Sequence, residues 1–404
     1  MVYSASSATG ALSDGDPLGY LKRYLLIGGV GLILMRLASR FDLSKLREIT
    51  PLILAGAFVM LVLVLLPGFG VEINGAKRWL GAGVLRFQPS EVMKLALVLY
   101  AAMLIANDPQ RVRNLRSMAE PLFWVIGAAG GLIMLQPDMG TDLVIVATMG
   151  TMLIAAGAKL QDLAKVVGVL AVMVLLLSIL EPYRMARITA FLNPSHDPTG
   201  IGYQSEQARI AIGSGGFFGV GIGESIQKVH YMPEAHTDMI LAVIGEELGL
   251  MGIIGLCLLY FALIVGGLRA AKNSRDIYAR MLGIGITSMV ACQALLNFFA
   301  VLGMAPLTGV PLPFISYGGA NLMIMLVAMG LLVNVASGRH TARVRVLRGG
   351  GRDEITVHRT RRSEPDVQKR AAMAGAAPRT RGHYEDRDRR RGNGGSRRSG
   401  PGSR

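Results

Sequence analysis

The sequence predicts an all-α polytopic membrane protein, and two observations carry this prediction. Apolar residues make up 51% of the chain and charged residues only 17%, as is typical of proteins whose helices face lipid. Apolar stretches close to the length of a bilayer span also recur along the first 338 residues. Nine spans are expected, at residues 24–38, 49–66, 92–105, 121–135, 141–156, 163–180, 239–268, 281–304 and 315–335.

Positive charge indicates which way these spans run. Arginine and lysine gather in alternate loops, and such loops lie on the cytoplasmic side of a membrane. A long loop at residues 182–238, before span 239–268, is therefore expected on the extracytoplasmic face. The cationic residues are Arg36, Arg40, Lys45 and Arg47; Arg111, Arg113 and Arg116; Lys159 and Lys165; and Arg269, Lys272, Arg275 and Arg280.

Residues 339–404 are expected to form a disordered, basic cytoplasmic tail behind a membrane-embedded domain at residues 1–338. The tail holds 19 of the 42 lysines and arginines but only 7 of the 27 acidic residues, and its large apolar residues are too few for a core. Two roles stay open: a solvated segment that fixes topology, or a docking segment for anionic lipid or an acidic partner. No nucleic-acid partner is expected.

Lys94 is an unusual charge because it lies inside an expected span, where a lone cation costs about 2.5–3.5 kcal/mol on insertion scales. Glu91, three residues earlier on the same helical face, indicates a structural ion pair. The alternative is that Lys94 and Arg86 form a cationic wall for an anionic lipid headgroup. Lys77 and Arg78 add charge at the same surface, where they also fit the role of interface anchors.

Acidic residues gather where the long loop meets span 239–268. Asp238 lies at the expected start of a helix, where it fits a simple N-cap or a general base partly desolvated by the membrane boundary. His236 and Glu234 are candidates for orienting it or for holding a divalent cation, although no further His/Cys pattern predicts a fixed metal site. About two turns further on, at least one of Glu246 and Glu247 is expected to face the protein interior.

Two segments rich in glycine or proline are expected to lack regular structure. Residues 213–223 repeat glycine at short spacing, but without the strand or the Lys-Ser/Thr pair of a nucleotide-binding loop. We expect a flexible outer loop there, with its backbone close to membrane or substrate. Residues 306–319 hold three prolines and a Gly-Gly pair. They predict irregular backbone at membrane depth, packed against protein or lining a cavity.

Taken in order, the motifs of this chain resemble those of the SEDS family (shape, elongation, division and sporulation). The resemblance extends over nearly all of residues 1–335, and residues 2–7 and 225–231 are more similar to the division members than to the elongation members. The motifs are Asn74-Gly-Ala-Lys-Arg-Trp-Leu80, Arg86-Phe-Gln-Pro-Ser-Glu-Val-Met-Lys94, Leu135-Gln-Pro-Asp-Met-Gly-Thr141, Gly202-Tyr-Gln204, Tyr231-Met-Pro-Glu-Ala-His-Thr-Asp238, Gly245-Glu-Glu-Leu-Gly249 and Pro313-Phe-Ile-Ser-Tyr-Gly-Gly319.

The resemblance implies a SEDS-type helical bundle of ten spans. The family motif that follows the first span, Tyr-Ser-Ala-Ser-Ser, begins here at Tyr3. The charge pattern also places the first residue outside, with no signal peptide to carry it across. We therefore expect the first span to be missing through a misassigned start. Ala320-Asn321 replaces a serine that relatives usually carry after Gly-Gly.

The resemblance further implies a peptidoglycan glycosyltransferase that polymerises lipid II at the septum, on the outer face of the bacterial cytoplasmic membrane. Its implied partners are a class B penicillin-binding transpeptidase and other divisome membrane proteins. Asp238 would take the proton of the acceptor hydroxyl, while Arg86 and Lys94, with Mg2+ or Mn2+ as a divalent cation, would stabilise undecaprenyl pyrophosphate as it leaves. No organic cofactor is expected. A lipid II flippase and a non-enzymatic divisome scaffold are the alternatives. Lys77, Arg78, Glu234 and His236 complete the expected substrate-binding set.

Overall fold

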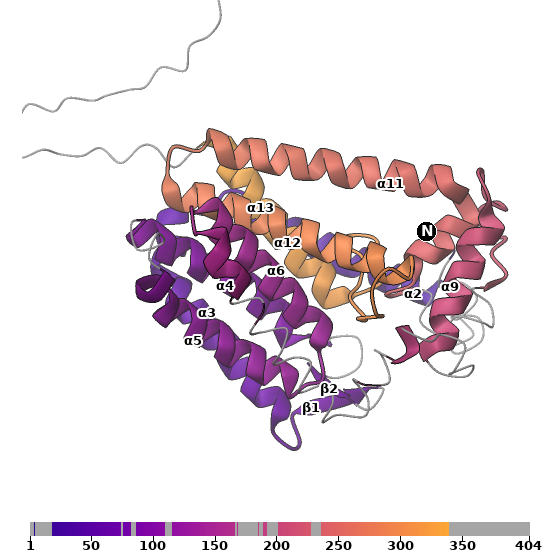
Figure 1. The fold of residues 1–404 in the computed structure, drawn as a ribbon, viewed down its shortest axis with the longest axis horizontal. Coiled ribbons are helices and arrows are strands. Elements are labelled where there is room, and N and C mark those ends of the chain that lie inside the picture. Colours follow the sequence, from indigo (N-terminus) through magenta and orange to yellow (C-terminus); the bar gives the residue numbers. More distant parts are fainter. Residues whose placement is uncertain are drawn as a thin grey trace, which may run out of the picture. The chain divides into compact units, whose positions relative to one another are not determined.

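The computed structural model describes residues 4, 18–73, 76–81, 86–109, 115–165, 168, 185, 189–191, 201–227 and 236–338. Most of these residues are helical, which confirms the predicted all-α fold (Figure 1). Eight of the nine expected spans coincide with a helix, whereas the span at 163–180 and the tail at 339–404 lie largely or wholly outside the described residues. The helices are α2 (Gly19–Ala38), α3 (Leu43–Leu65), α4 (Pro89–Asn107), α5 (Leu115–Met134), α6 (Met139–Ala155), α9 (Ile201–Gly215), α11 (Ile240–Asn273), α12 (Ile277–Val301) and α13 (Gly319–Ser337).

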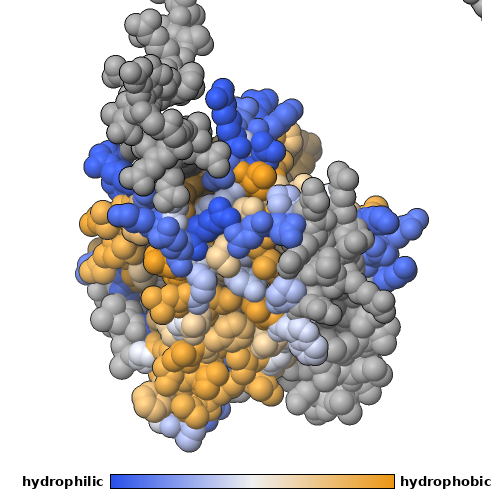
Figure 2. All heavy atoms as spheres, turned by 90° about the vertical axis from the view of Figure 1, so that its left-hand side faces the viewer, coloured by the Kyte–Doolittle hydropathy of each residue, from blue (hydrophilic) through white to orange (hydrophobic). Residues whose placement is uncertain are grey.

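Within the described residues, five helices, α3, α4, α11, α12 and α13, are long and apolar enough to cross a membrane. Shorter apolar helical stretches, Pro121–Met134 and Met139–Ala155, lie in α5 and α6. Figure 2 shows a broad hydrophobic surface bounded on one side by hydrophilic residues, as expected where helices face lipid. The chain is therefore an integral membrane protein.

α4 and α12 are the most enclosed of these long helices. α4 packs against α3, α6 and α12, and α12 packs in addition against α6, α11 and α13. Glycine allows close approach: a Cβ added at Gly285 of α12 would lie 2.6 Å from Val98 Cγ1 of α4 and 2.7 Å from Met152 Sδ of α6. Polar groups on the enclosed sides of these helices must therefore find partners within the protein.

A short β-hairpin between α3 and α4 was not predicted. Strand β1 (Gly70–Ile73) pairs antiparallel with β2 (Ala76–Leu80), with Gly70 opposite Leu80. Leu80 also exchanges backbone hydrogen bonds of 2.8 Å with Phe87, just before α4 begins. The hairpin therefore fixes where the chain enters the central helix α4.

The glycine-rich segment at residues 213–223 differs from the free outer loop that we expected. Its first residues end α9, and its backbone then bonds to α11, through Val220 N to Glu246 O (2.9 Å) and Gly221 N to Glu247 O (3.1 Å). At this contact α11 is interrupted, because Gly249 adopts φ 65° and ψ −163°. The break leaves a short buried part, residues 240–248, that leads from the candidate site to the longer part of the helix.

Candidate active site at the start of the long helix

Asp238 lies in a turn at residues 236–239, directly before α11. Its side chain is partly buried, and Oδ1 accepts a hydrogen bond from Thr237 Oγ1 at 3.2 Å. The N-cap residue of α11 is Met239. Asp238 therefore lies one residue before the N-cap position. Its role as a general base does not depend on that position and stays a prediction.

The backbone of the turn is held from α12 by one buried amide. Asn297 Nδ2 donates hydrogen bonds of 2.8 Å to the carbonyl oxygens of Asp238 and Val310. Asn297 is only 1% exposed, so water does not compete for these bonds. The amide therefore ties the start of α11 to the irregular segment 302–318 that follows α12.

A second buried amide lies four residues earlier on α12. Gln293 Nε2 donates to Pro311 O (2.9 Å) and to Asn321 Oδ1 (3.0 Å), while its Oε1 accepts from Lys94 Nζ (2.7 Å). Because residues four apart share a helix face, Gln293 and Asn297 form what we call the polar ladder of α12. The ladder brings the Lys94 ammonium and the backbone of Asp238 to neighbouring turns of one helix.

Lys94 also pairs with Glu91, with 2.9 Å between Nζ and Oε2, and both side chains are 2% exposed. The structural ion pair that the three-residue spacing indicated is therefore present. Arg86, in contrast, is exposed in the segment before α4. The Arg86 side chain is therefore open to a ligand, whereas the Lys94 ammonium is enclosed by protein.

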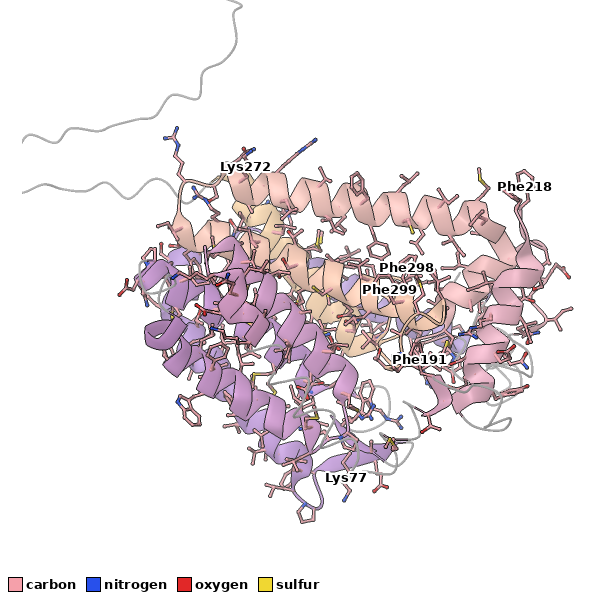
Figure 3. The ribbon with its side chains drawn as sticks, in the orientation of Figure 1. Lys77, Phe191, Phe218, Lys272, Phe298 and Phe299 are labelled. Carbon is pink, nitrogen blue, oxygen red and sulfur yellow. The ribbon has the colours of Figure 1, made fainter. Side chains whose placement is uncertain are left out.

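The two cations of the hairpin have different surroundings. Lys77 is exposed on β2, where Figure 3 shows it near the hairpin end. Arg78 instead donates through Nε to Gln136 O at 2.9 Å and through its guanidinium to Pro137 O. Arg78 thus binds the carbonyls that follow α5, so its contacts in the structure are with the protein itself.

His236 is buried beside the turn, and Glu234 lies outside the described residues. The His236 carbonyl accepts a 2.9 Å hydrogen bond from Tyr317 N. The centroid of the His236 ring lies 5.1 Å from that of Tyr20 and 5.7 Å from that of Tyr317. This aromatic packing fits a residue that orients the turn. Among the described residues no three His, Cys, Asp or Glu side chains are grouped as a metal site requires.

The side chains of Glu246, Glu247 and Asp138 accept hydrogen bonds within the protein. Glu246 and Glu247 are both buried, which confirms that at least one faces the interior; Glu246 accepts from Ser225 Oγ (2.5 Å) and Glu247 from Ser4 Oγ. Asp138 is the N-cap of α6, where its side chain accepts from Thr141 N. The polar ladder itself was missed from the sequence, although its signal was available as two amides four residues apart in span 281–304.

Comparisons with known proteins agree with this architecture. A family model for FtsW, RodA and SpoVE, described as "Cell cycle protein", matches residues 1–341. The chain is 42% identical over 338 residues to "Probable peptidoglycan glycosyltransferase FtsW" of Trichlorobacter lovleyi, covering 84% of this chain and 89% of that protein. It is 40% identical over 338 residues to "Stage V sporulation protein E" of Bacillus subtilis, covering 83% and 92%.

Solved structures show the same relationship. A chain from a structure described as "Structural coordination of polymerization and crosslinking by a peptidoglycan synthase complex" matches with a TM-score of 0.68 at 28% identity, covering 84% of this chain and 95% of that one. Rod shape determining protein RodA of Thermus thermophilus matches with a TM-score of 0.60 at 27% identity, covering 84% and 94%. The SEDS resemblance is thereby confirmed: the chain belongs to the FtsW, RodA and SpoVE family of cell cycle proteins.

Proposed function

We propose that the chain is a peptidoglycan glycosyltransferase that polymerises lipid II during septal cell-wall synthesis. The names of several relatives, probable peptidoglycan glycosyltransferases, support the activity. One structural observation carries the proposal to particular residues. Asp238 is a partly buried carboxylate whose backbone is tethered by Asn297, on the helix face that also holds Lys94 through Gln293.

Asp238 acts as the general base. Its carboxylate removes the proton from the GlcNAc 4-hydroxyl of the acceptor while that oxygen attacks C1 of the lipid-linked MurNAc. The bond from C1 to the diphosphate oxygen breaks with inversion at C1, and undecaprenyl pyrophosphate leaves with the bonding electrons. The role requires a carboxylate that is held in position, and the Asn297 amide tethers the turn that carries Asp238.

The leaving diphosphate gains negative charge, which cationic groups stabilise. Arg86 is exposed and is the group that we assign to direct contact, with exposed Lys77 as a further contact on the hairpin. Lys94 is buried between Glu91 and Gln293, so we assign it the role of holding the polar ladder beneath the site. A divalent cation, Mg2+ or Mn2+, remains an expectation, and no step above depends on it.

A class B penicillin-binding transpeptidase is the proposed partner. The similarity to a chain from a peptidoglycan synthase complex that coordinates polymerisation and crosslinking supports this assignment. The alternating cationic loops support an active site on the outer face of the cytoplasmic membrane, with the basic tail on the inner face.

Vesicles that present lipid II only in the leaflet facing the proposed site test the function. The wild-type chain with its transpeptidase partner should make glycan polymer, whereas a flippase would change only the leaflet distribution and a scaffold would do neither. Asp238→Asn should insert and bind its partner but lose about 10²- to 10⁴-fold in polymerisation rate, the usual contribution of a general base. Wild-type polymer synthesis by Asp238→Asn would remove Asp238 from this role.

A further inference from the structure

An apolar segment between α9 and α11 exposes large side chains that no described element covers. We call residues 216–226 the spur; Phe217 is 65% exposed, Phe218 82%, Ile222 72% and Ile226 69%. Glu224 is the single charged residue in the spur. Contiguous exposure of this kind is unfavourable in water and marks a surface that meets another apolar phase.

Backbone hydrogen bonds fix the spur against α11, just beyond the break in that helix. Leu250 N donates to Gly216 O (2.9 Å) and Met251 N donates to Phe217 O (3.2 Å). The far end is held by Glu246, whose Oε1 accepts from the backbone N of Ile226 (3.0 Å). The spur therefore has a defined register along α11, and the exposed side chains of Leu250 and Met251 continue its apolar surface.

The part of α11 beyond the break has the length of a bilayer core. About 21 residues separate Met251 from Lys272, and at about 1.5 Å per residue they span roughly 31 Å, against about 30 Å for the hydrocarbon of a bilayer. Between them, Ile254, Leu258 and Phe261 are exposed at helical spacing, as a lipid-facing stripe requires. Figure 3 shows Lys272 at one end of α11 and Phe218 beside the other.

Exposed Arg269 and Lys272 mark one membrane boundary, because arginine and lysine are placed there by their headgroup and water contacts. The opposite boundary then falls at Met251, the residue bonded to the spur. We propose that the spur is a membrane-interface anchor, with Phe217, Phe218 and Ile222 inserted between phospholipid headgroups and acyl chains on the side opposite to Lys272. Aromatic and branched apolar side chains on a glycine-rich backbone suit this shallow layer.

The anchor gives the short buried part of α11 a fixed depth. Residues 240–248 are bonded to the spur through the backbone carbonyls of Glu246 and Glu247, and they lead directly to Asp238. Seating the spur in the interface therefore holds this part of the helix close to the plane of lipid headgroups. The proposal does not depend on glycosyl transfer, because its partner is the bilayer itself.

Site-directed spin labelling tests the anchor in phosphatidylcholine and phosphatidylglycerol vesicles that hold the chain alone. With Cys257 and Cys292 replaced by alanine, single nitroxides are placed through Phe218→Cys, Leu259→Cys and Lys272→Cys. Collisions with oxygen report lipid, and collisions with a water-soluble nickel chelate report solvent. Leu259 is 70% exposed in the middle of the apolar stripe, so its label also verifies insertion.

The label at Phe218 should collide with oxygen less than the label at Leu259 does, and with nickel no more often than the label at Lys272, which lies at the other membrane boundary. This intermediate depth is the signature of an interface. Nickel collisions at Phe218 well above those at Lys272 would overturn the proposal, since these vesicles hold no partner to cover the spur. Low collision rates with both reagents would overturn it as well, because the side chain would then be buried in protein.

Discussion

Replacing Asn297 by leucine tests whether the polar ladder positions the base. Leucine keeps the side-chain size but removes Nδ2, which donates two buried hydrogen bonds of 2.8 Å. A buried carbonyl left without a donor costs about 1–3 kcal/mol, although hydrogen bonds within membrane bundles average nearer 0.6 kcal/mol. For the carbonyls of Asp238 and Val310 together we expect a loss of about 1–6 kcal/mol in the free energy of unfolding.

The substitution should also slow turnover. Without the tether the turn at residues 236–239 can shift, and a displacement of about 1 Å at a reacting group costs about 10²-fold in rate. We expect Asn297→Leu to lower kcat for lipid II polymerisation by about 10²-fold. Its KM should change little, because Asn297 holds the turn from within the protein and its bonds are to backbone carbonyls.

Polymer synthesis in vesicles and unfolding in mixed micelles measure the two effects separately. Thr287→Val is the matched control, because Thr287 is buried on the same helix and donates to Gly283 O of that helix (2.7 Å). If Asn297 acts through Asp238, the combined Asn297→Leu and Asp238→Asn variant should be no slower than Asp238→Asn alone. Wild-type kcat in folded Asn297→Leu would refute the reasoning, and so would a further loss in the combined variant.

Two further substitutions probe the break in α11 and the buried ion pair. Gly249→Ala should destabilise the chain and release the spur, because the φ and ψ of Gly249 are open almost only to glycine and a Cβ there would lie 2.6 Å from Phe217 O. Gly255→Ala should be tolerated, because a Cβ at Gly255 meets nothing within 4 Å. Unfolding in mixed micelles measures the stability of both variants. Lys94→Met should cost about 3–5 kcal/mol by leaving Glu91 buried without its cation, and Glu91→Gln in the same chain should recover most of that loss. If the double variant folds but does not polymerise lipid II, Lys94 also serves the reaction.

The spans were predictable because lipid imposes their length. Helices α3, α4, α11, α12 and α13 coincide with apolar stretches that the sequence shows directly. The break at Gly249 was not predictable in the same way, since residues 239–268 read as one continuous apolar span. It arises from a non-local contact, in which Gly216 and Phe217 supply carbonyls to the amides of Leu250 and Met251. The hairpin was not predicted because its strands, of four and five residues, are much shorter than a bilayer span.

The candidate site was predictable where its signals are local. The Glu91–Lys94 pair followed from three-residue spacing. The sequence also placed Asp238 between a polar loop and an apolar span, and its role as the base stays a prediction. The grouping of Arg86 with Lys94 rested on sequence proximity, but the two differ in burial because one precedes α4 and the other lies about one and a half turns inside it. Arg78 could not be placed either, since its carbonyl partners, on Gln136 and Pro137, are 58 and 59 residues away.

The polar ladder also explains why a non-helical segment can persist inside a membrane bundle. Backbone carbonyls in residues 302–318 lack helical partners, and lipid offers no water to replace them. Side chains take that part instead: the amides of Gln293 and Asn297 bind Pro311 and Val310, and the Tyr260 hydroxyl binds Pro313 O at 2.5 Å. Because Asn297 uses the same nitrogen for Val310 and Asp238, the bonds that make irregular backbone tolerable also hold the backbone of the proposed base. Loss of order in residues 302–318 should therefore lower the rate of turnover before it impairs insertion of the helices into the membrane.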